Sequence, residues 1–231
     1  QYKSMRYAKK SLGQNFLIDP NIIKKIINLT NIFDKNVLEI GPGKGALTNE
    51  ILKNKPKSLT LIEKDNFLSK ELKLKYNNNK KVIIHNKDVL KFNFEKKLEK
   101  DTIIFGNLPY NISSQILVKF LRFKLWPPKF IDLIFMFQKE LGEKIIGKFS
   151  STNYGRISIL TNYRLNIINK FLVSPNCFFP KPKVTSMIIQ FRPKKQKMNI
   201  NINNLEKITQ IFFSTKRKMI NKNIHRLLGK N

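Results

Sequence analysis

The feature that most constrains the fold is a repeated alternation of short apolar segments and helical patterns between residues 37 and 146. The apolar segments are four to seven residues long, which suits strands that are buried on both faces of a sheet. Parallel strands are joined by helical crossovers, and these crossovers cover both faces. The alternation therefore predicts an α/β protein with a mainly parallel sheet. The predicted strands span 37–40, 58–63, 82–85, 102–105 and 131–137, and the predicted helices span 45–52, 66–75, 113–123 and 139–146.

Both ends of the chain depart from this alternation. A basic arm precedes residue 19, where Asp19 and Pro20 predict the cap and the first position of a helix. Residues 166–173 and 185–192 resemble two strands with no helix between them, so we expect an antiparallel pair at the sheet edge. A helical pattern from about residue 203 is too short to form a core alone, so we expect it to dock on the sheet.

A glycine turn follows the first strand of the alternation. Gly41 permits a tight turn, and Gly43 lets a ligand approach the backbone closely. Glu63 ends the next strand about 20 residues after Gly43, where a carboxylate can accept hydrogen bonds from ribose hydroxyls. Asp88 follows the third strand and can hold an adenine amino group. Together these residues predict a ligand that contains adenosine.

Asn107-Leu108-Pro109-Tyr110 follows the fourth strand and offers an amide oxygen, a backbone carbonyl, a rigid turn and an aromatic face. A base with an amino group fits such a site, because the oxygens accept hydrogen bonds from the amine and the ring stacks on the base. The tetrapeptide has no evident role in hydride transfer. Glu39, beside the glycine turn, suits a cationic amino-acid group better than a pyrophosphate. Both arguments favour S-adenosyl-L-methionine over a nicotinamide dinucleotide.

The chain has 45 basic and 15 acidic residues and a formal net charge of +30. A surface this basic predicts a polyanionic partner, and nucleic acid is the default choice. The alternative is a basic composition that reflects a biased genome and has no such partner. No membrane partner is expected, because no apolar stretch approaches the roughly 20 residues that a span requires. Cys177 is the only cysteine, so we expect neither a disulfide framework nor a metal site.

With these features, the chain resembles the KsgA-type small-subunit ribosomal RNA adenine dimethyltransferases. The resemblance implies a seven-stranded, Rossmann-like, S-adenosylmethionine-dependent methyltransferase fold with a small helical C-terminal domain. It also implies ribosomal RNA of the small subunit as the substrate and dimethylation of adjacent adenosines, as part of ribosome biogenesis. The matching segments are 12–17, 39–43, 62–63, Asp88, 106–114, 137–140, 154–156 and 178–184.

The resemblance and the residues together assign roles to individual side chains. Hydrogen bonds from the target amine to the Asn107 side chain and the Leu108 carbonyl would orient the amine, while Tyr110 and Phe178 would stack on the base, Phe179 being the less favoured choice. The predicted cofactor contacts are Asn15, Leu17, Gly41, Gly43, Glu63, Asp88 and Asn107, and the predicted RNA contacts are Lys9, Lys10, Arg156, Lys216, Arg217 and Lys218.

We expect two domains: residues 1–193 as the S-adenosylmethionine-binding catalytic domain with its basic arm, and 194–231 as the helical C-terminal domain. The second domain is short for the family, and we expect it to be truncated after Leu228. A cytoplasmic monomer is expected, or an organellar protein if a transit peptide was removed. The alternatives are an Erm-type methylase of large-subunit RNA, a ribosome assembly or organellar transcription factor without catalysis, and a nicotinamide enzyme.

Overall fold

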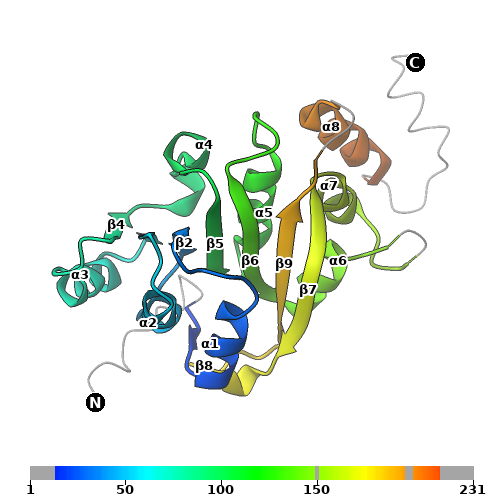
Figure 1. Cartoon of the computed structure of the whole chain (residues 1–231). Coiled ribbons are helices and arrows are strands. Elements are labelled where there is room, and N and C mark those ends of the chain that lie inside the picture. Colours follow the sequence, from blue (N-terminus) through cyan, green and yellow to red (C-terminus); the bar gives the residue numbers. More distant parts are fainter. Residues whose placement is uncertain (1–13, 149–150, 196–199, 214–231) are drawn as a thin grey trace.

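The computed structural model describes residues 14–148, 151–195 and 200–213. Its centre is a seven-stranded sheet with the strand order β4-β3-β2-β5-β6-β9-β7 (Figure 1). Neighbouring strands from β4 to β6 run parallel, and β9 runs antiparallel to both β6 and β7. The predicted α/β class and mainly parallel sheet are confirmed. The strands are β2 (Asn36–Ile40), β3 (Ser58–Glu63), β4 (Val82–Asn86), β5 (Thr102–Asn107), β6 (Phe130–Gln138), β7 (Leu165–Val173) and β9 (Ser186–Pro193).

Helices cover both faces of this sheet, as Figure 1 shows. The strands alternate their side chains between two apolar clusters. In β5, for example, Ile103 and Phe105 join one cluster with helices α1 to α3, whereas Ile104 joins the other with helices α4 to α8. The helices are α1 (Pro20–Ile27), α2 (Ala46–Lys53), α3 (Asn66–Lys75), α4 (Phe94–Lys97), α5 (Ser113–Leu121), α6 (Lys139–Ile145), α7 (Arg156–Arg164) and α8 (Ile202–Phe213).

Local sequence explains where several helices begin. The Asp19 carboxylate accepts hydrogen bonds from the backbone of Asn21 and Ile22, and Pro20 occupies the first position of α1, as predicted. Asp65 caps α3 in the same way. No helix in the described ranges is both long and apolar enough to cross a membrane.

Helices α4 and α7 and a short two-stranded ribbon were not predicted from the sequence. Helix α7 leads directly into β7; its sequence is polar and lacks a clear apolar stripe. A separate two-stranded ribbon joins β1 (Phe16–Leu17) to β8 (Phe178–Phe179) in antiparallel register. Short pairs of this kind carry no periodic pattern, because each strand contributes only two residues.

Helix α8 docks on the sheet domain, as the sequence predicted, through Ile202, which joins one apolar cluster, and through the carboxylate of Glu206. Glu206 accepts hydrogen bonds from Arg122, the residue after α5, at 2.6 and 2.9 Å, and from Arg156 of α7, at 2.9 Å. The two guanidinium groups lower the pKa of Glu206. Arg156 is thus engaged within the protein while its side chain stays partly exposed, and its contact with RNA stays a prediction. The division into domains at 193/194 stays a prediction.

Replacement of Glu206 by Ala should therefore weaken the docking of α8. The change leaves two arginines without their shared carboxylate, and we expect a loss of about 1–2 kcal/mol in the free energy of unfolding by urea. Glu140→Ala is the matched control, because Glu140 is fully exposed and its ion pair among the described residues is with Lys144, one helical turn away. Equal effects of the two substitutions would contradict the docking role.

Candidate active site

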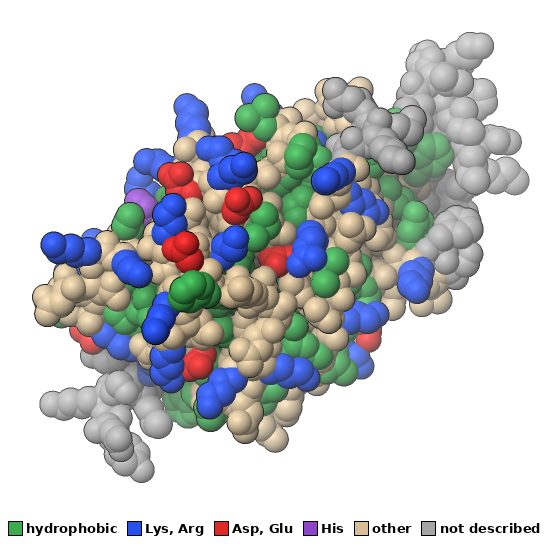
Figure 2. Space-filling view, viewed as in Figure 1, with side chains coloured by type: hydrophobic (Ala, Val, Ile, Leu, Met, Phe, Trp, Pro, Cys, Tyr) green, Lys and Arg blue, Asp and Glu red, His purple; other side chains and the backbone are tan. Residues whose placement is uncertain are grey.

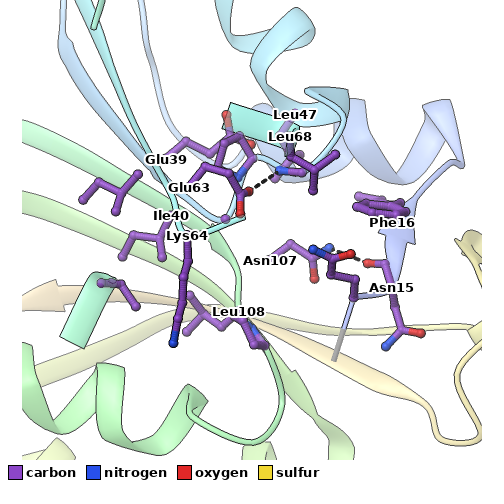
Figure 3. A pocket seen from close by; sticks show the side chains of 18 of the residues that line it. Asn15, Phe16, Glu39, Ile40, Leu47, Glu63, Lys64, Leu68, Asn107 and Leu108 are labelled. Carbon is purple, nitrogen blue, oxygen red and sulfur yellow. Dashed lines mark hydrogen bonds between the residues drawn. The ribbon is translucent and has the colours of Figure 1, made fainter. Parts of the chain in front are cut away.

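A pocket opens at the carboxyl ends of β2, β3 and β5 (Figure 3). Its walls come from the glycine turn after β2, the end of β3, the Asn-Leu-Pro-Tyr motif after β5 and residues 14–17 of the amino-terminal segment. Ligands of parallel α/β sheets bind at this edge, where the strands end and the loops diverge. Of the predicted cofactor residues, the pocket is lined by Asn15, Leu17, Gly41, Gly43, Glu63 and Asn107.

The glycine turn has a backbone that only glycine adopts easily. Gly41, Gly43 and Gly45 have φ values of +67°, +56° and +82°. A Cβ atom on Gly43 would lie 2.9 Å from the Phe16 ring, so the absence of a side chain also lets the amino-terminal segment pack against the turn. The Gly41 N–H donates to the Ile62 carbonyl at 2.9 Å, which ties the turn to the end of β3.

Glu63 lies at the end of β3 and is 6% exposed. Its carboxylate accepts a hydrogen bond from the Gly43 N–H at 3.1 Å and from the Asp65 N–H at 2.8 Å. Burial raises the pKa of Glu63, and the two backbone donors oppose this effect. The glycine turn and the carboxylate therefore hold each other in place at the wall of the pocket (Figure 3).

Glu39 lines the same pocket and is almost fully buried. Thr48 of α2 donates a hydrogen bond of 2.6 Å to this carboxylate. Burial raises the pKa of Glu39 to about 8, and the nearby charge of Glu63 adds to the effect. A cation in the pocket would favour the ionised form of Glu39, because opposite charges attract strongly where water is excluded.

The Asn107 side chain is oriented by a residue far away in the sequence. Its amide nitrogen donates a hydrogen bond of 3.0 Å to the Asn15 backbone carbonyl (Figure 3). Asn107 lines the pocket, and its amide oxygen, an acceptor, takes no part in this bond. The structure thus brings together Asn107 and the glycine turn, as predicted, and it adds the amino-terminal segment to the site.

The next residues of the motif divide their roles between core and pocket. Leu108 is 2% exposed, its side chain lies against Gly106, and the residue also lines the pocket. Tyr110 also lines the pocket, and its hydroxyl lies 2.6 Å from the hydroxyl of Ser186 on β9. The predicted placement of both residues at the rim of the fourth parallel strand agrees with the structure.

The prediction for Phe178 is contradicted by its burial. Phe178 is 2% exposed and packs in the core beneath α1, so its ring has no free face for a base. The ribbon register explains this, because Phe178 pairs with Leu17 and Phe179 pairs with Phe16. Opposite residues of an antiparallel pair lie on the same face. Phe179, which pairs with Phe16, is 38% exposed and replaces Phe178 as the candidate aromatic because of this exposure, although neither Phe178 nor Phe179 lines the pocket.

Asp88 is engaged within the protein. Its carboxylate forms an ion pair of 2.8 Å with Lys64 and accepts a hydrogen bond from the Leu90 backbone. Lys64 is the main cause of the lowered pKa of Asp88. The pocket is lined by the neighbours Lys87 and Val89 but not by Asp88 itself, so its contact with a cofactor stays a prediction.

The amino-terminal segment is the part of the site that we did not derive from the residues alone. Phe16 packs on Gly43, and Lys44 lies over the Phe16 ring at 5.0 Å from its centre. The only sequence signal was the resemblance, which assigned Asn15 and Leu17 to the cofactor.

The predicted RNA contacts Lys9, Lys10, Lys216, Arg217 and Lys218 lie outside the described residues. Within the described ranges, no three His, Cys, Asp or Glu side chains are placed to hold a metal ion.

Comparison with known proteins identifies the family of this chain. A family model described as "Ribosomal RNA adenine dimethylase" matches residues 5–231. The chain belongs to this family. A Pelagibacter ubique protein named ribosomal RNA small subunit methyltransferase A is 47% identical over 219 residues, which cover 93% of this chain and 82% of the relative. A Malacoplasma penetrans protein of the same name is 43% identical and aligns over 96% of this chain and 79% of its own length.

Solved structures agree with the fold of this family. A dimethyladenosine transferase from Plasmodium falciparum superposes with a TM-score of 0.80 at 30% identity, covering 91% of this chain and 75% of that one. The 23S ribosomal RNA methyltransferase ErmE superposes with a TM-score of 0.72 at 25% identity, covering 92% and 84%. This family member therefore has the expected methyltransferase fold and is an S-adenosylmethionine-dependent enzyme.

Replacement of Gly43 by Ala should disturb the pocket. The left-handed backbone costs a non-glycine residue about 1–2 kcal/mol, and the new methyl group would also meet the Phe16 ring. We expect a lower melting temperature and weaker cofactor binding in a titration. Gly155→Ala is the control, since a Cβ atom there meets nothing within 4 Å. An unchanged Gly43→Ala protein would contradict the packing of Phe16 on the turn.

Proposed function

We propose that this enzyme transfers methyl groups from S-adenosyl-L-methionine to the exocyclic amine of adenines in small-subunit ribosomal RNA. The proposal includes dimethylation of adjacent adenosines, a role in ribosome biogenesis and action as a cytoplasmic monomer. The observation that carries it is the Asn107 amide, whose nitrogen is held by Asn15 and whose oxygen remains for an amine donor. The names of the similar relatives support the small subunit as the source of the RNA.

The residues of the pocket fit this methyl donor. Glu63 places a carboxylate where ribose hydroxyls can donate to it, and the apolar side chains of Ile40, Ile62 and Leu68 suit an adenine ring. Glu39 and Glu63 give the pocket two buried carboxylates, which favour a cationic ligand over a phosphate. The bound donor supplies a methyl group on a sulfonium, which is already activated for transfer.

The protein's contribution is to prepare the acceptor amine. The lone pair of this amine is spread into the adenine ring, which makes it a poor nucleophile. Hydrogen bonds from the amine to the Asn107 oxygen and the Leu108 carbonyl direct the lone pair toward the methyl group and favour a tetrahedral nitrogen. Tyr110 stacks on the base, and such stacking contributes about 1–3 kcal/mol per base.

The surface suits a large RNA. Figure 2 shows Lys and Arg side chains spread over the visible face, with few acidic groups between them. Three lysines line the pocket, and each follows the carboxyl end of a parallel strand: Lys44, Lys64 and Lys87. Such positions suit phosphates on either side of an adenine that has left its stack.

The experiment that tests this proposal compares the two ribosomal subunits. Purified protein is incubated with labelled S-adenosylmethionine and with under-methylated small or large subunits, and the labelled nucleosides are then analysed. We expect dimethyladenosine from small subunits, and none with Asn107→Ala, which should still bind the donor. Label in large subunits alone would instead show methylation of large-subunit ribosomal RNA, as the name of ErmE describes. Normal transfer by Asn107→Ala would contradict the proposed role of Asn107 in catalysis.

Binding of the donor should depend on pH through Glu39. Burial raises the pKa of Glu39 to about 8, so Glu39 holds a proton at neutral pH, and we expect a cationic donor to displace it. Affinity should therefore rise between pH 6.0 and 7.5, by at most about tenfold per pH unit for one displaced proton. Glu39→Gln has no proton to lose, so its affinity should change less over this range in calorimetric titrations. If the affinity for the donor changed equally with pH in both proteins, the displaced proton would come from another group, such as Glu63.

A further inference from the structure

Tyr110 belongs to the loop between β5 and α5, yet it is held at both ends. The Ser113 hydroxyl, at the start of α5, donates to the Tyr110 carbonyl at 3.1 Å. The Tyr110 hydroxyl lies 2.6 Å from the Ser186 hydroxyl, at the start of β9. A loop residue is thereby tied to one helix and one strand, which restricts both its backbone and its ring.

Ser186 is a rigid anchor for this ring. Ser186 is fully buried, and in the sheet it lies opposite Gln138 of β6 on one side and Val173 of β7 on the other. The neighbouring Thr185 carbonyl accepts a hydrogen bond from the Lys139 N–H at 2.9 Å, which extends the contact between β6 and β9. The Ser186 hydroxyl therefore has little freedom to move.

The Tyr110 ring itself is only partly buried and lines the pocket. A tyrosine hydroxyl keeps its proton at neutral pH, and burial raises the pKa of Tyr110 further, so the hydroxyl can donate or accept in the contact with Ser186. Without that bond, the Tyr110 hydroxyl would have no hydrogen-bond partner among the described residues, and the ring would border the pocket without a fixed orientation. A partly exposed ring of this kind samples more than one orientation.

We propose that Ser186 is a positioning residue for the acceptor base, because it holds the Tyr110 ring in the orientation that stacks on the target adenine. This role rests on the proposed function. Its effect should appear in kcat more than in RNA binding, since phosphate contacts dominate the affinity for RNA. A tilted base, in contrast, loses the alignment between its amine and the methyl group.

Two conservative variants remove the same bond from opposite sides. Ser186→Ala and Tyr110→Phe should each lower kcat by about 5- to 20-fold, the effect of one lost hydrogen bond at the reacting geometry. The KM for small subunits and the dissociation constant of the donor should change by less than about twofold. The double variant should be no slower than the slower single variant, because both substitutions remove one interaction.

Ser69→Ala is the matched control for the loss of a buried serine hydroxyl. Ser69 is 1% exposed, lies in α3, and its hydroxyl has no hydrogen-bond partner among the described residues. Its kcat should equal that of the unmodified enzyme. A lower melting temperature with unchanged kcat in Ser186→Ala, or additive losses in the double variant, would overturn the positioning role.

The outcomes also separate this role from the proposed function. If Ser186→Ala does not fold, Tyr110→Phe still removes the bond, and an unchanged kcat in that variant overturns the proposal. No transfer by the unmodified enzyme to small subunits would overturn the proposed function and this role together. Normal transfer with unaffected variants would overturn the role of Ser186 alone.

Discussion

The parallel register of β2 with β3 and β5 is the constraint on which the rest of the site depends. Ile40 pairs with Ile62 on one side and with Gly106 on the other, so the three strands end at the same level. The glycine turn, Glu63 and Asn107 therefore emerge at one edge of the sheet. A shift by one residue would move buried side chains to the opposite face, so the two apolar cores fix this register.

The polar groups of the pocket are already engaged before any ligand arrives. Glu63 is held by the glycine turn, Glu39 by Thr48 and Asn107 by the Asn15 carbonyl. Groups that are fixed in advance do not have to reorganise when substrate binds, which lowers the free energy needed to reach the transition state. The same contacts leave defined acceptor atoms for a ligand: carboxylate oxygens beside the turn and an amide oxygen at the end of β5.

Segments that are distant in sequence complete this arrangement. The ribbon of β1 and β8 brings the amino-terminal segment against the glycine turn, and β9 brings Ser186 to Tyr110. The contact between Asn15 and Asn107 joins residues 92 positions apart, and the contact between Tyr110 and Ser186 joins residues 76 apart. The site is thus assembled around the parallel strands from both ends of the described chain.

The sequence alone determined the parallel strands, the helix that begins after Asp19, the glycine turn and the placement of Asn107, because these follow from local periodicity, capping and backbone freedom. It could not assign Arg156 to Glu206 or Asp88 to Lys64, since ion pairs depend on which surfaces the fold brings together. Only the tertiary structure decided that Phe178 is buried in the core and that Phe179 is partly exposed. Strand register sets which of the two rings is buried, and the local sequence of two adjacent phenylalanines does not specify that register.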